Sequence, residues 1–379
     1  MTRQRTRRAR ATIFCSLTGF ALLQLALAVS IELWSPQFRD PYYGQRINLL
    51  RRRNVTVAPR PFTVLMLGTS RTRNGLLGKT LERQLGQVQS RPVVVFNFGQ
   101  DSAGPMTELV NLKRLLADGA RPDLLLIEVW PPLLCEQEAF DEVGELRLPA
   151  HRLRPDDLPL VEHYAKPLRS NLRREWWQAT LVPWYGHRLK IFSCVAPLLI
   201  SRQSRYEGID HLDDTCSFDY DWAKSHVGRD PDGEKYAAAL ERARSAYGPI
   251  LADFRLGEPH CEALNELLTL CRESNIATAL VMMPEGPEFR SWYRPDDWSM
   301  LENYLGTISR TYRMPLINCR TWIAENDFLD SHHLRIDGAA EFTRRLGTEA
   351  ILPMLRDWPM DGYDGTSGRM AGQRDDPLR

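Results

Sequence analysis

The sequence has almost no excess of charge of either sign. Its 49 lysines and arginines nearly balance 48 aspartates and glutamates, which leaves a formal net charge of +1. A chain without a strongly basic balance gives no reason to expect a nucleic-acid partner. Internal repeats are also lacking, and the seven cysteines form neither a CxxC pair nor a zinc-ligand spacing. We therefore expect no metal and no cofactor.

Long apolar runs are missing after residue 31, and Val195–Ile200 is too short to span a bilayer. Ala11–Ile31, by contrast, carries no charge and follows five arginines, with no acidic residue before Glu32. A helix of this length can cross a hydrocarbon layer of about 30 Å. The positive-inside rule keeps residues 1–10 in the cytoplasm as a basic tail. We expect a single-pass anchor at residues 11–33 in the cell inner membrane, with the remaining chain on the periplasmic side.

A cleaved signal peptide is the alternative, because Ala26-Leu27-Ala28 resembles a cleavage site. The apolar run is longer than the roughly 7–15 residues of a signal-peptide core, which favours an uncleaved anchor. Both interpretations export the rest of the chain, where disulfides between the cysteines are permitted. Cys271 falls on the apolar stripe of a predicted helix, so a buried free thiol is expected there.

Downstream of the anchor, apolar runs of strand length alternate with segments of helical periodicity. Pro105 and Pro259 stand in the first turns of two of the predicted helices. This alternation predicts an α/β fold with a parallel sheet and right-handed crossovers. The predicted strands are Phe62–Leu67, Val93–Phe98, Leu124–Ile127, Ala277–Met282 and Leu316–Asn318.

A long insertion is expected to interrupt this core. It is rich in aromatic residues, which either pack a small helical cap or stack on sugar rings as a lid. The predicted segments are a stalk at 34–60, the two parts of the core at 61–134 and 258–357, a helical insertion at 135–257 and a disordered tail at 358–379.

Three segments that could carry chemistry follow predicted strands. Gly68-Thr69-Ser70 follows the first strand, Asn97-Phe98-Gly99 ends the second, and Asp330-Ser331-His332-His333 follows the fifth. Ligands of open parallel sheets bind at the carboxyl ends of the strands. The fold is therefore expected to bring together a serine nucleophile, a histidine base and a carboxylate that orients the histidine.

Other interpretations of these residues remain open at this level. Gly-Thr-Ser after a strand is often only a helix cap, and His332 is a second candidate base. Asp330 and the two histidines also offer metal ligands, although no distant partner with ligand spacing appears. Gly78-Lys79-Thr80 suggests a nucleotide-binding P-loop, but that template demands glycine where Arg73 stands.

Taken together, the segments resemble the sequence blocks of the SGNH (GDSL-like) hydrolase and acyltransferase superfamily. Gly68-Thr69-Ser70 is similar to its Gly-Asp-Ser block, and Asn97-Phe98-Gly99 to the block with the oxyanion glycine. Asp330–Leu334, followed by Gly338-Ala339-Ala340, is similar to the last block. The resemblance covers Phe62–Glu128 and Ala277–Leu355. It implies a three-layer α/β/α, flavodoxin-like sheet with a helical insertion.

By this resemblance, Ser70 is the nucleophile, His333 the base and Asp330 its orienting carboxylate. Ser70 and Gly99, with Asn97, would form the oxyanion hole. Two positions depart from the family pattern. Thr69 replaces the usual aspartate, and the asparagine of the third block is absent from Glu128-Val129-Trp130-Pro131. The loss of one oxyanion donor typically lowers the rate by about 10²–10³.

The resemblance also implies a type of substrate. The expected arrangement, a membrane anchor followed by an exported SGNH-like domain, is similar to that of proteins that O-acetylate alginate and other exopolysaccharides. Arg71 and Arg73 are candidates to bind an anionic substrate, or are solvated loop residues. Glu285 and Arg290 follow the fourth strand and would line the cleft. We expect an extracytoplasmic esterase or O-acyltransferase acting on acylated envelope glycans, with envelope assembly proteins as further partners. The alternative is a catalytically weak module that binds or scaffolds exopolysaccharide.

Overall fold

A sheet of five parallel strands forms the centre of the molecule. The computed structural model describes residues 2–34, 38–56, 59–136, 148–165, 169–199, 213–217, 220 and 233–356. The strands pair in the order β2-β1-β3-β4-β5. All five predicted strands are present, each within one residue of its expected bounds. They are β1 (Phe62–Gly68), β2 (Val93–Gly99), β3 (Leu124–Glu128), β4 (Ala277–Met282) and β5 (Leu316–Asn318).

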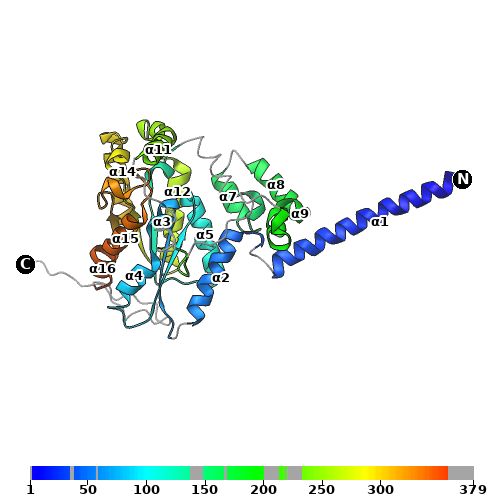
Figure 1. Cartoon of the computed structure of the whole chain (residues 1–379), viewed down its shortest axis with the longest axis horizontal. Helices are drawn as coiled ribbons and strands as arrows, with labels where there is room; N and C mark the ends of the chain where they lie inside the picture. The colour runs from blue at the N-terminus through cyan, green and yellow to red at the C-terminus, as the bar shows by residue number, and fades with distance from the viewer. Residues whose placement is uncertain are drawn as a thin grey trace, which may run out of the picture.

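Helices cover both faces of this sheet (Figure 1). Side chains alternate along a strand, so Leu65 packs on one face of the sheet and Val64 on the other. This confirms the α/β class predicted from the sequence. The first face carries α2 (Pro41–Thr56), α5 (Pro105–Ala117), α12 (Glu258–Glu273) and α14 (Pro295–Tyr312). The second carries α4 (Gly78–Leu85), α15 (Ile336–Arg345), the π-helix η9 (Leu346–Ile351) and α16 (Leu352–Arg356).

The N-terminal helix α1 (Thr2–Val29) projects away from this body and continues into the π-helix η1 (Ser30–Trp34) (Figure 1). The segment Arg5–Glu32 is long and apolar enough to cross a membrane, and only 6% of its most apolar window is buried. A candidate membrane helix is therefore present where the sequence predicts one. The basic residues predicted as a separate tail belong to the same continuous helix.

Between β3 and α12 the described residues are mainly helical. Within this region α8 and α9 contact α1. Trp176 is buried and donates a hydrogen bond from Nε1 to the carbonyl of Leu153 at 3.1 Å, whereas Trp177 is half exposed. Two further aromatic residues of the predicted insertion, Tyr206 and Trp222, lie outside the described residues. The predicted tail at 358–379 lies outside them as well. The helices are α7 (Leu158–Tyr164), α8 (Arg169–Leu181), α9 (Pro183–Val195) and α11 (Glu234–Ala252).

The cysteines whose side chains are described are free thiols. Cys271 is 1% exposed, as the apolar stripe of its helix predicts. Burial raises the pKa of its thiol to about 12, which keeps it protonated and unreactive. The other free thiols are Cys15, Cys135, Cys216, Cys261 and Cys319.

Candidate active site

The predicted nucleophile lies at the carboxyl edge of the sheet, beside the point where the strand order reverses. Gly68, the last residue of β1, pairs with Gly99 at the end of β2. Ser70 is the first residue of the short helix α3 (Ser70–Gly75), and Thr69 caps this helix by accepting a hydrogen bond from the Arg71 amide. Ser70 is only partly buried, so its hydroxyl stands at a reachable position. A topological switch point is where ligands of open α/β sheets bind.

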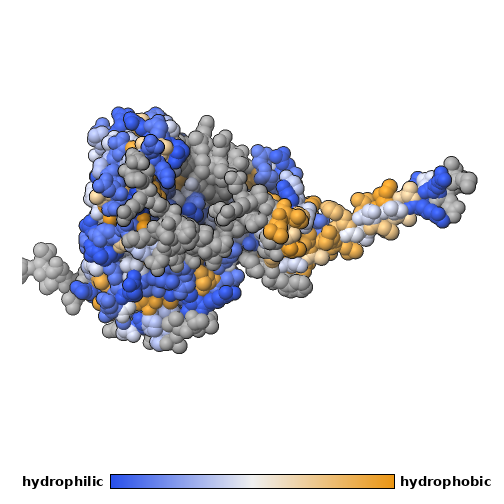
Figure 2. Space-filling model, viewed as in Figure 1, coloured by the Kyte–Doolittle hydropathy of each residue, from blue (hydrophilic) through white to orange (hydrophobic). Residues whose placement is uncertain are grey.

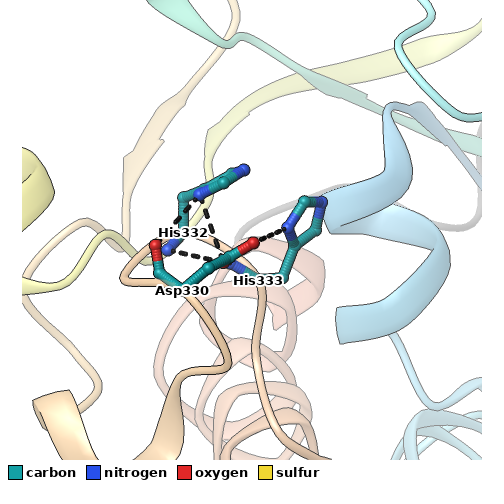
Figure 3. A group of neighbouring side chains, drawn as sticks. All are labelled: Asp330, His332 and His333. Carbon is teal, nitrogen blue, oxygen red and sulfur yellow. Dashed lines mark hydrogen bonds and ion pairs between the residues drawn. The ribbon is translucent and has the colours of Figure 1, made fainter. Parts of the chain in front are cut away.

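Ser70, His333 and Asp330 form a continuous hydrogen-bonded chain. The Oγ of Ser70 lies 2.7 Å from Nε2 of His333. On the other side of the ring, Nδ1 of His333 lies 2.7 Å from Oδ2 of Asp330. Figure 3 displays Asp330 below the ring of His333. Both distances fall within the range of about 2.6–3.2 Å needed for proton transfer between a nucleophile, its base and the orienting group.

The second oxygen of Asp330 fixes the backbone of the loop. Its Oδ1 accepts hydrogen bonds from the amides of His332 at 3.2 Å and His333 at 2.7 Å. Burial alone would raise the pKa of the Asp330 carboxyl. The hydrogen bond from the His333 ring and the two neighbouring histidines outweigh that effect and lower it to about 2. Asp330 is thus a carboxylate at any physiological pH.

His332, the alternative base, packs against Trp130, and the serine contact is made by His333. Its ring is 3% exposed and stacks on Trp130 with an interplanar angle of 10° and a centroid distance of 5.6 Å. Burial, together with the adjacent His333, lowers its pKa to about 3, so the ring is neutral. Of the two candidates, only His333 contacts the serine in the described residues. His332 instead packs against Trp130 behind the loop.

The loop that carries Asp330 and His333 is held by neighbouring segments. Ser331 has φ 65°, a left-handed conformation that a non-glycine residue adopts only when its surroundings impose it. Its carbonyl accepts from the Gly286 amide at 2.8 Å, and its Oγ accepts from the Phe289 amide at 3.1 Å. These contacts tie the loop to the segment after β4.

Glu128, at the end of β3, holds the turn around Ser70 and was not among the site residues predicted from the sequence. Its side chain is fully buried, and its Oε2 accepts hydrogen bonds from the Thr69 amide at 2.8 Å and the Thr72 hydroxyl at 2.7 Å. The Thr72 amide and the Thr69 hydroxyl donate to the same carboxylate. Four donors from the turn around Ser70 therefore converge on one side chain. The only sequence signal was an acidic residue closing an otherwise apolar strand.

A second buried carboxyl lies close to Glu128. Glu108 of α5 is 2% exposed, and its Oε1 has no hydrogen-bond partner in the described part of the chain. Burial, and then the charge of Glu128, raise its pKa well above the usual value for a glutamate. The protonated form of Glu108 is therefore favoured, while Glu128 accepts hydrogen bonds from its four donors and lies 3.7 Å from Arg71.

Asn97 and Gly99 do not supply the oxyanion donors predicted for them. The Gly99 amide donates to Oδ1 of Asn97 at 2.9 Å, so that N–H is already engaged. The Asn97 side chain is completely buried and donates to the carbonyls of Thr72 and Leu76, each at 2.9 Å. A Cβ on Gly99 would lie 2.4 Å from the Arg73 nitrogen, which explains the glycine by close packing. Both residues position the serine turn.

Arg71 is not available to bind a substrate, contrary to the sequence-based expectation. It is 2% exposed and donates to the carbonyls of Met283, Pro284 and His332. Its guanidinium also lies 3.6 Å from Glu285 and 3.7 Å from Glu128. Arg71 therefore links the serine helix to the end of β4 and to the histidine loop.

Glu285 and Arg290 also serve the framework rather than a cleft surface. Glu285 is 1% exposed and accepts from Arg320 at 2.6 Å and from the Tyr293 hydroxyl at 3.1 Å. Arg290 donates to the carbonyls of Glu285 and Arg320. Arg73 and Arg290 are partly exposed, and Arg73 lies 3.0 Å from Asp101.

Two competing chemistries find less support in the geometry. Asp330, His332 and His333 have ligand atoms within 4.8 Å of one another, as a metal site would. However, both ring nitrogens of His333 are taken up by Ser70 and Asp330, and neutral His332 faces the Asp330 carbonyl at 3.2 Å. Lys79 of the P-loop-like segment is half exposed and pairs with Asp214 at 3.3 Å.

A model of an uncharacterised protein family matches residues 183–354, from the start of α9 into α16, which is less than half of the chain. The matched segment includes Asp330 and His333 but not Ser70. No curated protein matches the sequence.

Proposed function

We propose that the chain is a serine acyl-transfer enzyme of the SGNH type, with Ser70 as nucleophile, His333 as general base and Asp330 as the orienting carboxylate. One observation carries this proposal. A serine, a histidine and an aspartate from segments 263 residues apart form an unbroken hydrogen-bonded chain with both contacts at 2.7 Å. The strand order β2-β1-β3-β4-β5 is the flavodoxin-like order, which is consistent with the three-layer architecture of that superfamily.

The contacts define the first half of the reaction. Oδ2 of Asp330 accepts the Nδ1 proton of His333, which leaves the Nε2 lone pair directed at Ser70 Oγ. As Oγ attacks an ester carbonyl, its proton moves to Nε2, and the imidazolium is stabilised by Asp330. Collapse of the tetrahedral species breaks the bond to the leaving alkoxide, which takes the proton from Nε2. Ser70 is then acylated.

The second half reverses these roles with a new acceptor. His333 removes a proton from water or from a glycan hydroxyl, whose oxygen attacks the acyl-serine. The bond to Oγ breaks, and Ser70 recovers its proton from Nε2. Water as acceptor makes the protein an esterase, and a glycan hydroxyl makes it an O-acyltransferase. The candidate membrane helix near Arg5–Glu32 and its preceding arginines favour an extracytoplasmic domain acting on acylated envelope glycans.

The test uses the full-length chain in a neutral detergent. We expect hydrolysis of p-nitrophenyl acetate and covalent labelling of Ser70 by a fluorophosphonate probe. Ser70→Ala and His333→Ala should each lower kcat by roughly 10⁴-fold or more. Ser299→Ala and His163→Ala change an exposed serine and an exposed histidine elsewhere, and should leave the rate unchanged. Equal turnover in the Ser70 and His333 variants and the wild type would overturn the assignment.

A catalytically weak SGNH-like module that binds or scaffolds exopolysaccharide is the second candidate. It is favoured by the oxyanion side of the site, where Asn97 engages the Gly99 amide and Glu128 closes β3. The amide of Ser70 is then the remaining predicted donor. Binding of an acetylated polysaccharide without turnover or probe labelling would support this candidate over the enzyme.

A further inference from the structure

A large cavity lies where the start of α2 meets α8 and α9, and Ser70, Asp330 and His333 are not among the residues that line it. Its volume is about 800 Å³, within the range of about 300–1,000 Å³ of ligand-binding sites. Among the described residues, five cationic side chains line it and one acidic side chain, Glu175, does so. The cations are Arg39, Arg152, Arg174, Arg188 and Lys190.

The electrostatics of this cavity favour an anion. Arg39 is 8% exposed; its guanidinium pairs with Glu32 and donates to the carbonyl of Leu153 at 2.6 Å, while its Nε has no hydrogen-bond partner within the described ranges. His151 and His187 also line the cavity, and the pKa of each is lowered to about 4, first by burial and then by neighbouring groups that include Arg152 and Arg39. Both rings are therefore neutral, and the excess of cationic side chains along the cavity lining is what favours an anion.

An exposed apolar surface adjoins the cavity. In α9 and the short helix η6 (Pro197–Leu199), Val195 is 79%, Leu198 88% and Leu199 77% exposed. Tyr185 and Leu189 belong to this surface and line the cavity as well. Figure 2 shows hydrophobic residues over α9 running on to α1. The cationic cavity and the apolar surface are therefore parts of one continuous region.

The contact with α1 sets the depth of this region in a membrane. The side-chain oxygen of Gln24 accepts a hydrogen bond from the Trp184 amide at 3.2 Å. Gln24 lies about two helical turns, roughly 10 Å, before Ile31 at the end of the apolar run. When α1 spans the bilayer, the first turn of α9 lies below the outer end of the hydrocarbon layer. Trp184 and Tyr185 in this turn, 37% and 59% exposed, then face acyl chains.

We propose that the cavity between α2, α8 and α9 binds the phosphate headgroup of an anionic membrane lipid, whose acyl chains lie against the exposed apolar side of α9 and η6. The cations recognise the phosphate, as guanidinium groups do in other phosphate sites. Tyr185 and Leu189 lie where the headgroup joins the glycerol and acyl portion. This site is independent of the proposed acyl-transfer activity.

The test measures lipid bound to the full-length chain in a neutral detergent. An equimolar mixture of phosphatidylglycerol and phosphatidylcholine with identical acyl chains is added, and bound lipid is counted by native mass spectrometry. We expect a preference for phosphatidylglycerol. Each surface lysine or arginine contributes about 1 kcal/mol to such binding, or roughly a fivefold change. Arg174→Gln and Arg188→Gln should therefore each weaken binding about fivefold, and the double variant roughly 30-fold.

Matched variants separate the site from general charge and general hydrophobicity. Arg83→Gln with Arg344→Gln removes the same charge from α4 and α15 and should leave the preference unchanged. Leu198→Asn with Leu199→Asn should weaken the binding of both lipids. Val88 is 50% exposed and lies elsewhere in the molecule, so Val88→Asn should leave the binding of both lipids unchanged. Equal binding of the two lipids, or equal losses in the cavity and control pairs, would overturn the proposal. Displacement of phosphatidylglycerol by inorganic phosphate alone would identify a soluble phosphate site instead of a lipid site.

Discussion

Two pairs of contacting histidines lie in different regions of the molecule, and of these four rings His333 is the one that contacts Ser70. The rings of His332 and His333 are 4.1 Å apart between centroids, and those of His151 and His187 are 5.9 Å apart. The first pair shares a loop with Asp330, whereas the second lies among arginines. A carboxylate at Nδ1 leaves the opposite nitrogen of His333 ready to accept a proton. His151 and His187 are kept neutral first by burial and then by neighbouring groups that include Arg152 and Arg39.

The largest effect on kcat is expected when the carboxylate beside His333 is removed. In Asp330→Asn, the amide no longer stabilises the imidazolium or fixes the tautomer, so kcat should fall by about 10⁴-fold. Hydrolysis of p-nitrophenyl acetate by the full-length chain measures the loss. Asp327→Asn, a carboxyl near the same loop, serves as the matched control and should remain within a few-fold of wild type. A small loss in Asp330→Asn would contradict the role given to Asp330.

Acid should destabilise the protein through the histidines that burial keeps neutral. The pKa values of His332, His151 and His187 are lowered from 6.5 to about 3, 4 and 4, whereas the unfolded chain binds protons near 6.5. Between these values the unfolded state holds more protons, so stability is full above pH 6.5 and falls as pH decreases. Each histidine lowers the free energy of unfolding by up to about 1.4 kcal/mol per pH unit.

Urea unfolding of the full-length chain in detergent between pH 7.5 and pH 5 measures this slope. The double variant His151→Gln with His187→Gln should reduce the slope by about two proton equivalents, independently of any change in its absolute stability. A flat profile in the wild type would show that these rings can be protonated without cost in the folded state.

Substitution of the two adjacent histidines sharpens the comparison within one loop. His332→Phe keeps an aromatic ring against Trp130 and leaves the contacts of His333 in place, so kcat should stay within about tenfold of wild type. In this variant the free energy of unfolding should also fall less steeply as pH decreases, by the equivalent of one proton. His333→Phe should instead abolish turnover while leaving the slope due to His332. The same loss of kcat in both variants would mean that His332 is needed for more than packing.

The smallest effect is expected at the second buried carboxyl. Glu108 has a raised pKa, so its stabilising contribution is complete below the unfolded value of 4.5 and is lost as pH rises. Glu108→Gln cannot ionise and should be more stable than wild type by an amount on the order of 1 kcal/mol at pH 8. The difference should vanish near pH 4.5. Thermal unfolding at the two pH values provides the measurement, and a destabilised variant at pH 8 would contradict the assignment.

Much of the site could be predicted because its parts follow strands. The apolar run Phe62–Leu67 and the segment after Leu316–Asn318 were enough to place Ser70, Asp330 and His333 at one edge of a parallel sheet. Which histidine faces the serine could not be read from the sequence. The answer depends on the left-handed Ser331 and on the aromatic wall formed by Trp130, which comes from a distant segment.

The buried polar groups were beyond sequence reasoning for a physical reason. Hydrophobic periodicity identifies apolar positions, but a charged residue such as Arg71 or Glu128 is buried only when several partners from other segments surround it. Those partners follow β1, β3, β4 and β5 and have no common sequence pattern. The same limit applies to Asn97 and Gly99, whose hydrogen-bonding groups satisfy each other and the serine turn.

The buried guanidinium of Arg71 has a consequence for the order in which the protein folds. It contacts carbonyls at the end of β4 and in the histidine loop, along with carboxylates from two further positions. A desolvated cation is costly until all such partners are present. A partly folded chain, with the early strands formed but the C-terminal loop undocked, leaves Arg71 in water. We therefore expect docking of that loop, completion of the ion network and alignment of Ser70 with His333 to occur together.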